Sequence, residues 1–328
     1  MSEAISPRTD RIVRLGKIAL VALVLAILPL VTQSPLLRRL FFLIVVFSMF
    51  GIALNIVFGH TDQLYLFVGA LAGVGGYTTA IAADALGISP WITIPVGLAL
   101  AGLIGAGVSY IAAKRRFTVI LIAVFTLTLE LAFNQFVVGF DEFTGGSTGF
   151  RIADVGIESN LTLYYLVAAV FVGFLLLYTR LIHSRFGVAF NAIREDELAA
   201  ESVGIEIVRY KTFAGALAAM LIALTGILYG FYEGRLYPSI YSFNNIDVAI
   251  LIMLTIGGLR TLLGPIVGAA FIFAIEEQLA DSPEFRIIIF GLLLIVLFLY
   301  FREGIVRKVG EFLERRDLDP ASLVESYT

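Results

Sequence analysis

The chain is dominated by apolar runs of the length that a membrane-spanning helix requires. A helix needs about 20 consecutive apolar residues to cross the hydrocarbon core of a bilayer. About ten candidate spans fall near 18–33, 37–58, 64–84, 90–112, 118–140, 161–180, 211–232, 246–259, 262–280 and 286–301. Hydrophobic residues make up 59% of the 328 positions, far above the share in soluble domains. The pattern predicts an all-α polytopic membrane protein.

The basic residues predict how the chain is oriented in the membrane. With the N-terminus inside, almost every basic group at a span end falls inside as well: Lys114 to Arg116, Arg180, Arg185, Arg194, Arg260, Arg302, Arg307 and Lys308. Only Arg38 and Arg39 do not fit, and the acidic segment 141–160 falls outside. We therefore expect both termini to be cytoplasmic. The expected divisions are an N-terminal segment (1–17), a transmembrane domain (18–301) with a cytoplasmic loop (181–210), and a C-terminal tail (302–328).

One polar segment, His183 to Lys211, interrupts the apolar runs, and we call it the polar island. It lies between two predicted spans, so it must lie in water at one face of the membrane. Acidic residues at 195–197 and a glycine at Gly204 predict a short helix from Arg194 to Val203. Its apolar positions are Ala192, Ile193, Ala199, Ala200 and Val203. Because the island has no evident core of its own, we expect a partner to cover these positions.

Glycine marks the helices that should lie inside the bundle, because small residues let helices approach closely in lipid. Four glycines each fall in the third and fourth spans: Gly69, Gly73, Gly75 and Gly76, then Gly97, Gly102, Gly105 and Gly107. Both spans are expected to be interior helices. The eighth and ninth spans are joined by GGLRTLLGP, which predicts a tight hairpin or, alternatively, a broken helix that lines a cavity.

A few polar residues are candidates for a translocation pathway. Glu130 lies near the middle of the fifth span, where a carboxylate costs about 2.5–3.5 kcal/mol unless it faces protein or water. It should face the interior, either as a pathway residue or as a packing carboxylate with a buried donor. Asn55 is better interpreted as a helix–helix hydrogen bond than as a substrate ligand. Gln63 and Tyr77 complete the candidate pathway set.

Several chemistries are excluded or weakened by the sequence. The chain has no cysteine, no phosphate-binding loop and no catalytic serine or metalloprotease motif, so catalysis is not expected. Neither a metal nor a cofactor is expected on this chain. His60 and His183 stand beside span ends and are interpreted as solvated. The basic residues form no stripe, which argues against nucleic acid as a partner. Energy for transport would come from an ion gradient or from a partner that hydrolyses ATP.

The polar island resembles the cytoplasmic loop of the permease subunits of branched-chain amino acid ABC transporters, specifically the M-type subunit. The resemblance covers most of the chain beyond residue 40 and rests on RFGVAFNAIREDELAAESVGIEIVRYK (185–211), GGLRTLLGPIVGAAF (257–271), TGGSTGF (144–150) and LNIVFG (54–59) with Gln63 and Leu64. One segment departs from the family pattern. Where the family usually has Ser-Leu-Gly-His before the third span, this chain has Tyr65, Leu66, Phe67 and Val68.

The resemblance implies a function for the island and a set of partners. The loop is similar to the coupling helix that docks in a groove of an ATPase subunit. Residues carried over to this role are Arg185, Gly187, Ala192, Arg194, Glu195, Asp196, Ala199, Ala200 and Gly204. The implied partners are a homologous second permease, two cytoplasmic ATPases that bind ATP and Mg²⁺, an extracytoplasmic solute-binding protein and membrane lipid. The implied location is a prokaryotic inner membrane, and the implied substrate is a branched-chain amino acid, urea or another small solute.

The residues alone leave a second function open. A self-contained secondary transporter could use an ion gradient, with Glu130 as its coupling carboxylate. Such a transporter has no need of an acidic docking helix and would more often carry several intramembrane charges. A membrane scaffold fits the glycine-rich interior spans poorly. The sequence therefore favours the ABC importer permease.

Overall fold

The computed structural model describes residues 7–31, 34–153, 155–157 and 159–278, and they are mostly helical. In chain order the elements are α1 (Pro7–Val31), α2 (Pro35–Leu54), η1 (Asn55–Gly59), α3 (Val68–Leu86), α4 (Pro90–Lys114), α5 (Val119–Gly139), α6 (Asp141–Thr144), η2 (Gly146–Thr148), β1 (Phe150–Arg151), α7 (Asn160–Ile182), α8 (Arg185–Glu195), α9 (Glu197–Ser202), α10 (Ile207–Glu233), β2 (Arg235–Leu236), η3 (Pro238–Tyr241), α11 (Asp247–Gly257) and α12 (Gly264–Gln278). Here η1 is a π-helical turn, while η2 and η3 are 3-10 turns.

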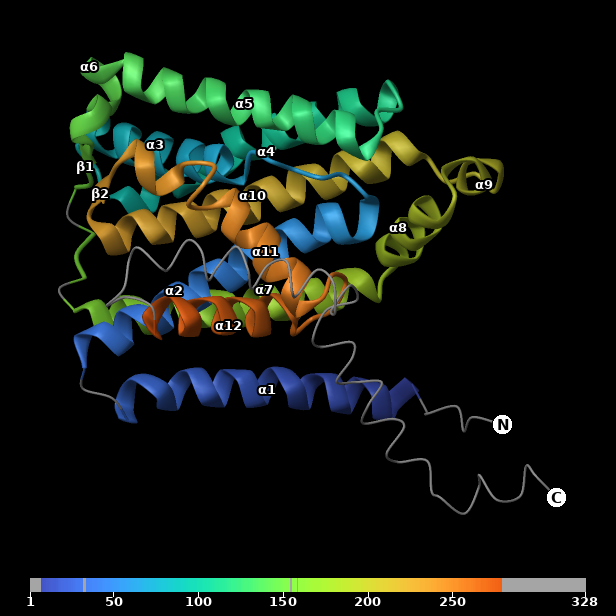
Figure 1. The fold of residues 1–328 in the computed structure, drawn as a ribbon, viewed down its shortest axis with the longest axis horizontal. Helices are drawn as coiled ribbons and strands as arrows, with labels where there is room; N and C mark the ends of the chain where they lie inside the picture. The colour runs from blue at the N-terminus through green and yellow to red at the C-terminus, as the bar shows by residue number, and fades with distance from the viewer. Residues whose placement is uncertain (1–6, 32–33, 154, 158, 279–328) are drawn as a thin grey trace.

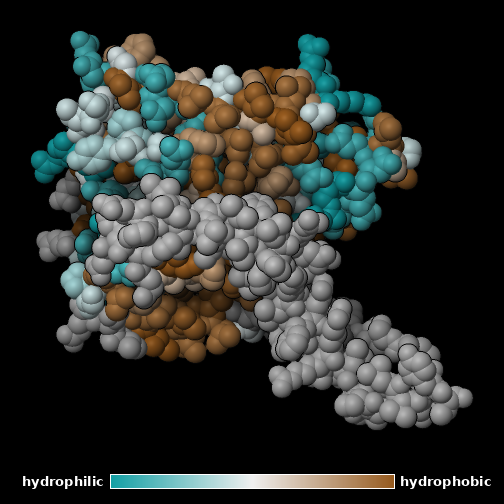
Figure 2. Space-filling model, in the orientation of Figure 1, coloured by the Kyte–Doolittle hydropathy of each residue, from teal (hydrophilic) through white to brown (hydrophobic). Residues whose placement is uncertain are grey.

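The long helices run side by side and form one bundle (Figure 1). Helix α5 lies along one side of the bundle and α1 along the other. Helices α8 and α9 project from one end, which we call the island end. The short antiparallel pair β1 and β2, together with α6, lies at the opposite end. Figure 2 shows apolar surface across the middle of this face and hydrophilic residues towards both ends, the distribution expected of a membrane-spanning bundle.

Five described helices are long and apolar enough to cross a membrane: Pro35–Gly59, Pro90–Lys114, Val119–Gly139, Asn160–Ile182 and Ile207–Glu233. Two shorter apolar helices are Ile18–Pro29 and Asp247–Gly257. The all-α membrane class is therefore confirmed. The count of ten spans and the cytoplasmic position of the termini stay predictions. The predicted span 286–301 and the tail 302–328 lie outside the described residues.

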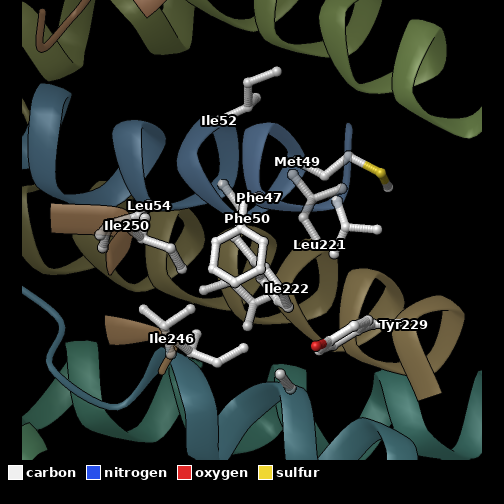
Figure 3. Packing of buried hydrophobic residues seen from close by; sticks show 14 of the residues in the cluster. Phe47, Met49, Phe50, Ile52, Leu54, Leu221, Ile222, Tyr229, Ile246 and Ile250 are labelled. Atoms are coloured by element: carbon white, nitrogen blue, oxygen red, sulfur yellow. The ribbon is translucent and has the colours of Figure 1, made fainter. Parts of the chain in front are cut away.

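Helix α10 lies at the centre of the bundle and packs against α2, α3 and α4. Figure 3 shows Met49 and Phe50 of α2 close to Leu221 and Ile222 of α10, with α11 beside them. Within the apolar stretch of α10, 72% of the residues are buried, whereas 22% are buried in the apolar stretch of α5. The bundle is therefore organised around α10, whereas α5 exposes most of its surface.

The glycine-rich helices pack closely on α10, but only one of them is enclosed. A Cβ atom added to Gly75 of α3 would lie 2.8 Å from the Cβ of Ala223 in α10, so only glycine allows this approach. Gly105 of α4 meets α10 in the same way. Gly107, however, has open space beside it, and Leu103 is 71% exposed. The expectation of an interior helix is right for α3 and wrong for the outer face of α4.

The predicted tight return of the chain after residue 257 is confirmed, but α11 has only 11 residues and is shorter than the eighth span predicted over 246–259. Helix α11 ends at Gly257, α12 begins at Gly264, and the two helices pack together. A Cβ atom on Gly257 would collide with the carbonyl of Gly264, so glycine permits the sharp return of the chain.

The third span begins later than the sequence predicts. Residues 62–67 are not helical, and α3 starts at Val68 rather than near residue 64. Backbone outside helices is tolerated in a bundle where protein groups satisfy it. Here the N–H of Leu66 donates to Oγ1 of Thr126 at 2.9 Å. The chain therefore enters α3 through a non-helical segment whose residues Gln63, Tyr65 and Phe67 are buried.

Candidate functional site

The polar island folds as two helices, α8 and α9, rather than the single helix predicted from Arg194 to Val203. Asp196 separates them in an extended conformation. Its carboxylate accepts the N–H groups of Leu198 and Ala199 at 2.8 and 3.0 Å, which makes it the N-cap of α9. This local bond competes with helix continuation at Asp196. Gly204, with φ of +86°, lies just beyond the end of α9, close to the predicted end of the helix.

The island also has a small core, so the expectation that a partner covers all its apolar positions is wrong. Ile193 and Ala200 are 1% and 3% exposed and pack with Ile207 at the start of α10. The exposed large apolar side chains are Leu198 and Val203, at 66% and 74%, and in α8 Val188 and Phe186, at 69% and 39%. The island therefore holds its own shape and presents four large apolar side chains outward.

Two ion pairs connect α9 to the long helices of the bundle. Lys211 of α10 is 5% exposed, and its ammonium contacts Oε1 of Glu197 in α9. Arg116, which follows α4, lies 2.9 Å from Glu201 in an exposed pair. The other residues carried over to the coupling role are spread over both helices. Arg185 and Glu195 are exposed, Ala192 and Arg194 are half-buried, Gly187 is buried against the carbonyl of Ile182, and Ala199 is exposed.

A second cluster lies in the middle of the bundle, and we call Glu130 with Asp247 the acidic centre. Each is 1% exposed, so the predicted interior position of Glu130 is confirmed. Asp247, at the start of α11, accepts the N–H groups of Val68 and Gly69 at 2.7 and 3.0 Å. Glu130 accepts the N–H of Ala70 at 2.5 Å. The acidic centre thus binds the first N–H groups of α3, where the helix dipole favours negative charge.

The acidic centre shows that two helices begin inside the bundle. Glu130 lies near the middle of α5, so the start of α3 and the start of α11 both lie at that depth. Oε1 of Glu130 has no hydrogen-bond partner among the described residues. The sequence analysis did not single out Asp247. The signal was available, since an aspartate at the head of a short apolar run is another carboxylate at membrane depth.

The segment that departs from the family pattern lies directly before the acidic centre. Tyr65 and Phe67 are almost fully buried, and their rings meet edge to face at 4.9 Å. The hydroxyl of Tyr65 donates to the carbonyl of Gly105 at 3.2 Å. Two aromatic rings therefore fill the approach to α3.

A third cluster, of Asn55, His60 and Tyr178, lies at the island end, and we call it the Asn55 cluster. Asn55 donates to the Tyr178 hydroxyl at 3.1 Å and to the carbonyl of Thr261 at 3.2 Å, and it accepts the N–H of Arg260 at 2.8 Å. The Tyr178 hydroxyl lies 2.8 Å from Nε2 of His60. Asn55 thus makes the helix–helix hydrogen bond suggested for it. Tyr178 gave no signal in the sequence.

His60 is buried, contrary to the expectation of a solvated residue. It is 3% exposed because α8 and the loop between α11 and α12 lie close to it. Burial is the main cause that lowers the pKa of His60 from 6.5 to about 4, and the charges of Arg194 and Arg260 add to it. Its ring is therefore neutral at pH 7. His183, by contrast, is exposed as expected.

The candidate pathway residues do not form one site. Asn55 lies at the island end and Glu130 at mid-depth, while Tyr77 donates to the carbonyl of Leu236 in β2 at the opposite end, 3.1 Å away. Gln63 is fully buried and donates to the carbonyl of Lys211 at 3.3 Å. They are distributed along the length of the bundle.

The glycine-rich segment TGGSTG forms a turn that is held by hydrogen bonds. Oγ1 of Thr144 donates to the carbonyl of Val137 at 2.6 Å, and Arg235 donates to the carbonyl of Thr148 at 3.0 Å. Beside it lies a cavity of about 550 Å³, lined by Asp84, Arg151, Ile152, Ala153, Val155, Phe231 and Gly234.

Comparisons with known proteins find similarity to transport permeases. A family model for the branched-chain amino acid transport system permease component matches residues 36–298. The high-affinity branched-chain amino acid transport system permease proteins LivM of Salmonella typhimurium and Escherichia coli are 24% and 25% identical to this chain, with alignments that cover 80% of it and 68% of each relative. A probable branched-chain amino acid transport permease protein LivH of Methanocaldococcus jannaschii is 26% identical, over 64% of this chain and 69% of its own length. No solved structure matches.

The matched family consists of transport permeases, not enzymes, and its model covers most of the chain. The resemblance seen in the polar island is therefore confirmed, and the protein is a multi-pass membrane protein that belongs to the branched-chain amino acid permease family.

Proposed function

We propose that this chain is a membrane-spanning permease subunit of an ABC importer for branched-chain amino acids or a related small solute. Two cytoplasmic ATPase subunits bind ATP and Mg²⁺ and supply the energy, while this chain binds no cofactor. A homologous second permease completes the path across the membrane. An extracytoplasmic solute-binding protein delivers the substrate.

The observation that carries the proposal is the build of the polar island. A docking element must be stiff, must offer apolar side chains to a partner, and must be joined firmly to helices that move. The island has its own core at Ile193 and Ala200, and exposes Leu198 and Val203. His183 and Ser184 alone separate α7 from α8, so the island is a direct continuation of a long helix. These properties suit a coupling element that docks on an ATPase.

In this proposal, the ATPase contacts exposed residues of the island. Leu198, Ala199 and Val203 lie on the outer surface and form the contact. Ala200 is buried in the island core, so it keeps α9 in shape and a bulky residue there would unfold the island. A tryptophan at Ala199 is therefore the informative large substitution.

The cavity at the opposite end supports a small zwitterionic substrate. Asp84 and Arg151 supply both signs of charge, and Phe231 supplies an apolar wall. An amino acid needs an anion for its ammonium, a cation for its carboxylate and an apolar surface for its side chain. In this proposal the cavity is where the solute-binding protein releases its substrate.

The test is to purify the tagged chain from membranes of its host and to identify the co-purifying proteins by mass spectrometry. We expect two copies of an ATPase subunit and one further permease. Leu198→Asp with Val203→Asp should remove the ATPase subunits, because it places charges in an apolar contact. Leu86→Asp is the control, since Leu86 is also 67% exposed but lies at the end of α3, away from the island.

Two results would contradict the proposal. A chain that purifies without ATPase subunits, and that transports in proteoliposomes with an ion gradient alone, would favour the secondary transporter. ATPase subunits retained equally by the Leu198→Asp and Val203→Asp variant would place the ATPase contact outside the island.

A further inference from the structure

We propose that the Asn55 cluster is a coupling relay that carries a shift of the polar island to the loop between α11 and α12. Its three members are positioning residues, which hold that loop in register with α8. The inference rests on the proposed function, because it assigns the path by which ATPase closure reaches the membrane-spanning helices.

At one end of the relay, Asn55 holds the loop by its backbone. It accepts the N–H of Arg260 at 2.8 Å and donates to the carbonyl of Thr261 at 3.2 Å, so two peptide groups of the loop, 259–260 and 261–262, bind one side chain. The loop is also braced internally. Thr261 donates to the carbonyl of Gly258 at 2.8 Å and accepts the N–H of Gly264 at 2.9 Å. The loop therefore moves as one unit with Asn55.

Asn55 reaches the loop because the helix that carries it changes shape at that point. Asn55 is the first residue of the π-helical turn η1. Such turns are rare in proteins overall, and those that occur are often found at functional sites. A Cβ atom on Gly59 would collide with Oδ1 of Asn55, so the glycine leaves room for the amide. The local distortion of the helix at η1 therefore places the Asn55 amide within hydrogen-bond distance of the loop.

The middle of the relay joins Asn55 to His60 through one hydroxyl. An amide nitrogen can only donate, so the Tyr178 oxygen accepts from Asn55, and the same hydroxyl shares a hydrogen bond of 2.8 Å with Nε2 of His60. The His60 ring also interacts with the side chain of Asn191 in α8. All the bonds join uncharged groups, so they can lengthen and reform without separating buried charges.

At the other end, the relay meets the island in two ways. Tyr178 lies in the last turns of α7, which continues into α8 after a capped junction where Ser184 accepts the N–H of Phe186 at 3.2 Å. The charge of Arg194 in α8 acts on His60, and so does the charge of Arg260 in the loop. In this relay, a displacement of α8 moves Tyr178 through α7 and so shifts the Tyr178 hydroxyl relative to Asn55 and His60.

The test compares two tyrosines of α7 that differ in their partners. Tyr178→Phe removes the relay hydroxyl and keeps the ring. Tyr164→Phe is the matched control, since Tyr164 is also 4% exposed and its hydroxyl donates to the carbonyl of Leu25 in α1 at 3.0 Å. Both variants are reconstituted in proteoliposomes as the complete complex, with solute-binding protein and radiolabelled leucine. Uptake and ATP hydrolysis are measured together.

For Tyr178→Phe we expect normal assembly, retained ATP hydrolysis and a roughly tenfold lower uptake per ATP, the factor that loss of about one buried hydrogen bond produces. Tyr164→Phe should keep the wild-type ratio. Asn55→Asp, which keeps the acceptor for Arg260 but loses both donated bonds, should lower the ratio similarly. The double variant should be no worse than either single variant, because both break one relay.

Three outcomes would overturn the relay. Tyr178→Phe could keep the wild-type ratio, both tyrosine variants could lose it equally, or Tyr178→Phe could lose uptake and ATP hydrolysis together through poor assembly. The second and third outcomes would indicate a packing role. Failure of the proposed function is distinct, because the wild-type complex would then show no ATP-dependent uptake at all, and the relay would fall with it.

Discussion

The acidic centre and the Asn55 cluster are both buried in the bundle, but they satisfy their polar atoms in different ways. Glu130 and Asp247 accept hydrogen bonds from backbone N–H groups at the start of α3. The Asn55 cluster joins neutral side chains to each other and to the backbone of a loop. The first consists of two carboxyl groups tied to a helix terminus, whereas the second consists of neutral side chains and spans three separate elements.

This difference indicates what each region does. A carboxyl group that accepts the first N–H groups of a helix fixes where that helix begins, and moving it would leave those backbone groups unsatisfied. The acidic centre is therefore a rigid part of the scaffold. Neutral side-chain bonds cost less to break and remake, so the Asn55 cluster is suited to movement. The predictions below test this contrast.

The largest effect is expected at Asp247, because its two bonds hold the start of α3. Asp247→Ala leaves the N–H groups of Val68 and Gly69 without partners in the bundle interior, at a cost of about 3–5 kcal/mol of stability. Asp247→Asn keeps one acceptor and should lose much less. Thermal unfolding in detergent, read by size-exclusion chromatography, measures both. An Asp247→Ala variant as stable as Asp84→Ala, which alters an exposed aspartate, would refute a scaffold role.

A smaller loss of stability is expected at Gly69, where the close packing of α3 leaves no space for a side chain. A Cβ atom on Gly69 would lie 2.9 Å from Oε1 of Glu130 and would collide with the carbonyl of Tyr241. Gly69→Ala should therefore destabilise the protein by about 1–3 kcal/mol. Gly107→Ala is the matched control, because that glycine of α4 has open space beside it and alanine favours a helix. Equal melting temperatures for the two variants would show that α3 can shift away from the acidic centre.

The acidic centre and the Asn55 cluster show which structural features the sequence predicts and which it does not. Hydropathy predicted the helices, and the cost of a charge in lipid predicted that Glu130 faces inward. The glycines and proline of the loop after α11 predicted the hairpin. Each of these signals is local or concerns one residue against its surroundings. The coupling role of the island residues and the pathway role of Glu130 stay predictions.

What the sequence did not predict depends on contacts between distant segments. Asn55 and Tyr178 are 123 positions apart, and nothing near either residue indicates that they meet. His60 was interpreted as solvated because it ends a span, and its burial comes from elements that follow much later. The late start of α3 was hidden because the extended segment before it is itself apolar. The island core was hidden because Ile207 belongs to the next long helix.

Because His60 is neutral in the folded protein, the stability of the protein should depend on pH. The pKa of His60 is about 4 in the folded protein and 6.5 ordinarily. The unfolded chain therefore binds a proton between these values that the folded protein does not, so stability falls as pH falls from about 6.5 to 4. At pH 5 the loss relative to pH 7 is about 2 kcal/mol. His60→Gln should lose correspondingly less on acidification, as measured by thermal unfolding at both values.

The control for this prediction is His183→Gln, because His183 is exposed at the same end of the bundle. It should keep the wild-type response to pH. If His60→Gln also keeps it, the Asn55 cluster tolerates a charge, and its contrast with the acidic centre fails.

The smallest effect is expected from the exposed ion pair of Arg116 and Glu201, whose side chains are 62% and 53% exposed. Water and salt screen such a pair, so it contributes about 0–1 kcal/mol. The island does not depend on it, because its core and the buried ammonium of Lys211 hold α9 in place. Glu201→Gln should therefore change neither the melting temperature nor the uptake per ATP by a measurable amount. Lys211→Met is the informative contrast, since it leaves Glu197 without its buried partner and should lower both. If Glu201→Gln reduced coupling as strongly as Lys211→Met, the island would be held to the bundle from its surface, and the relay through α7 would lose its mechanical basis.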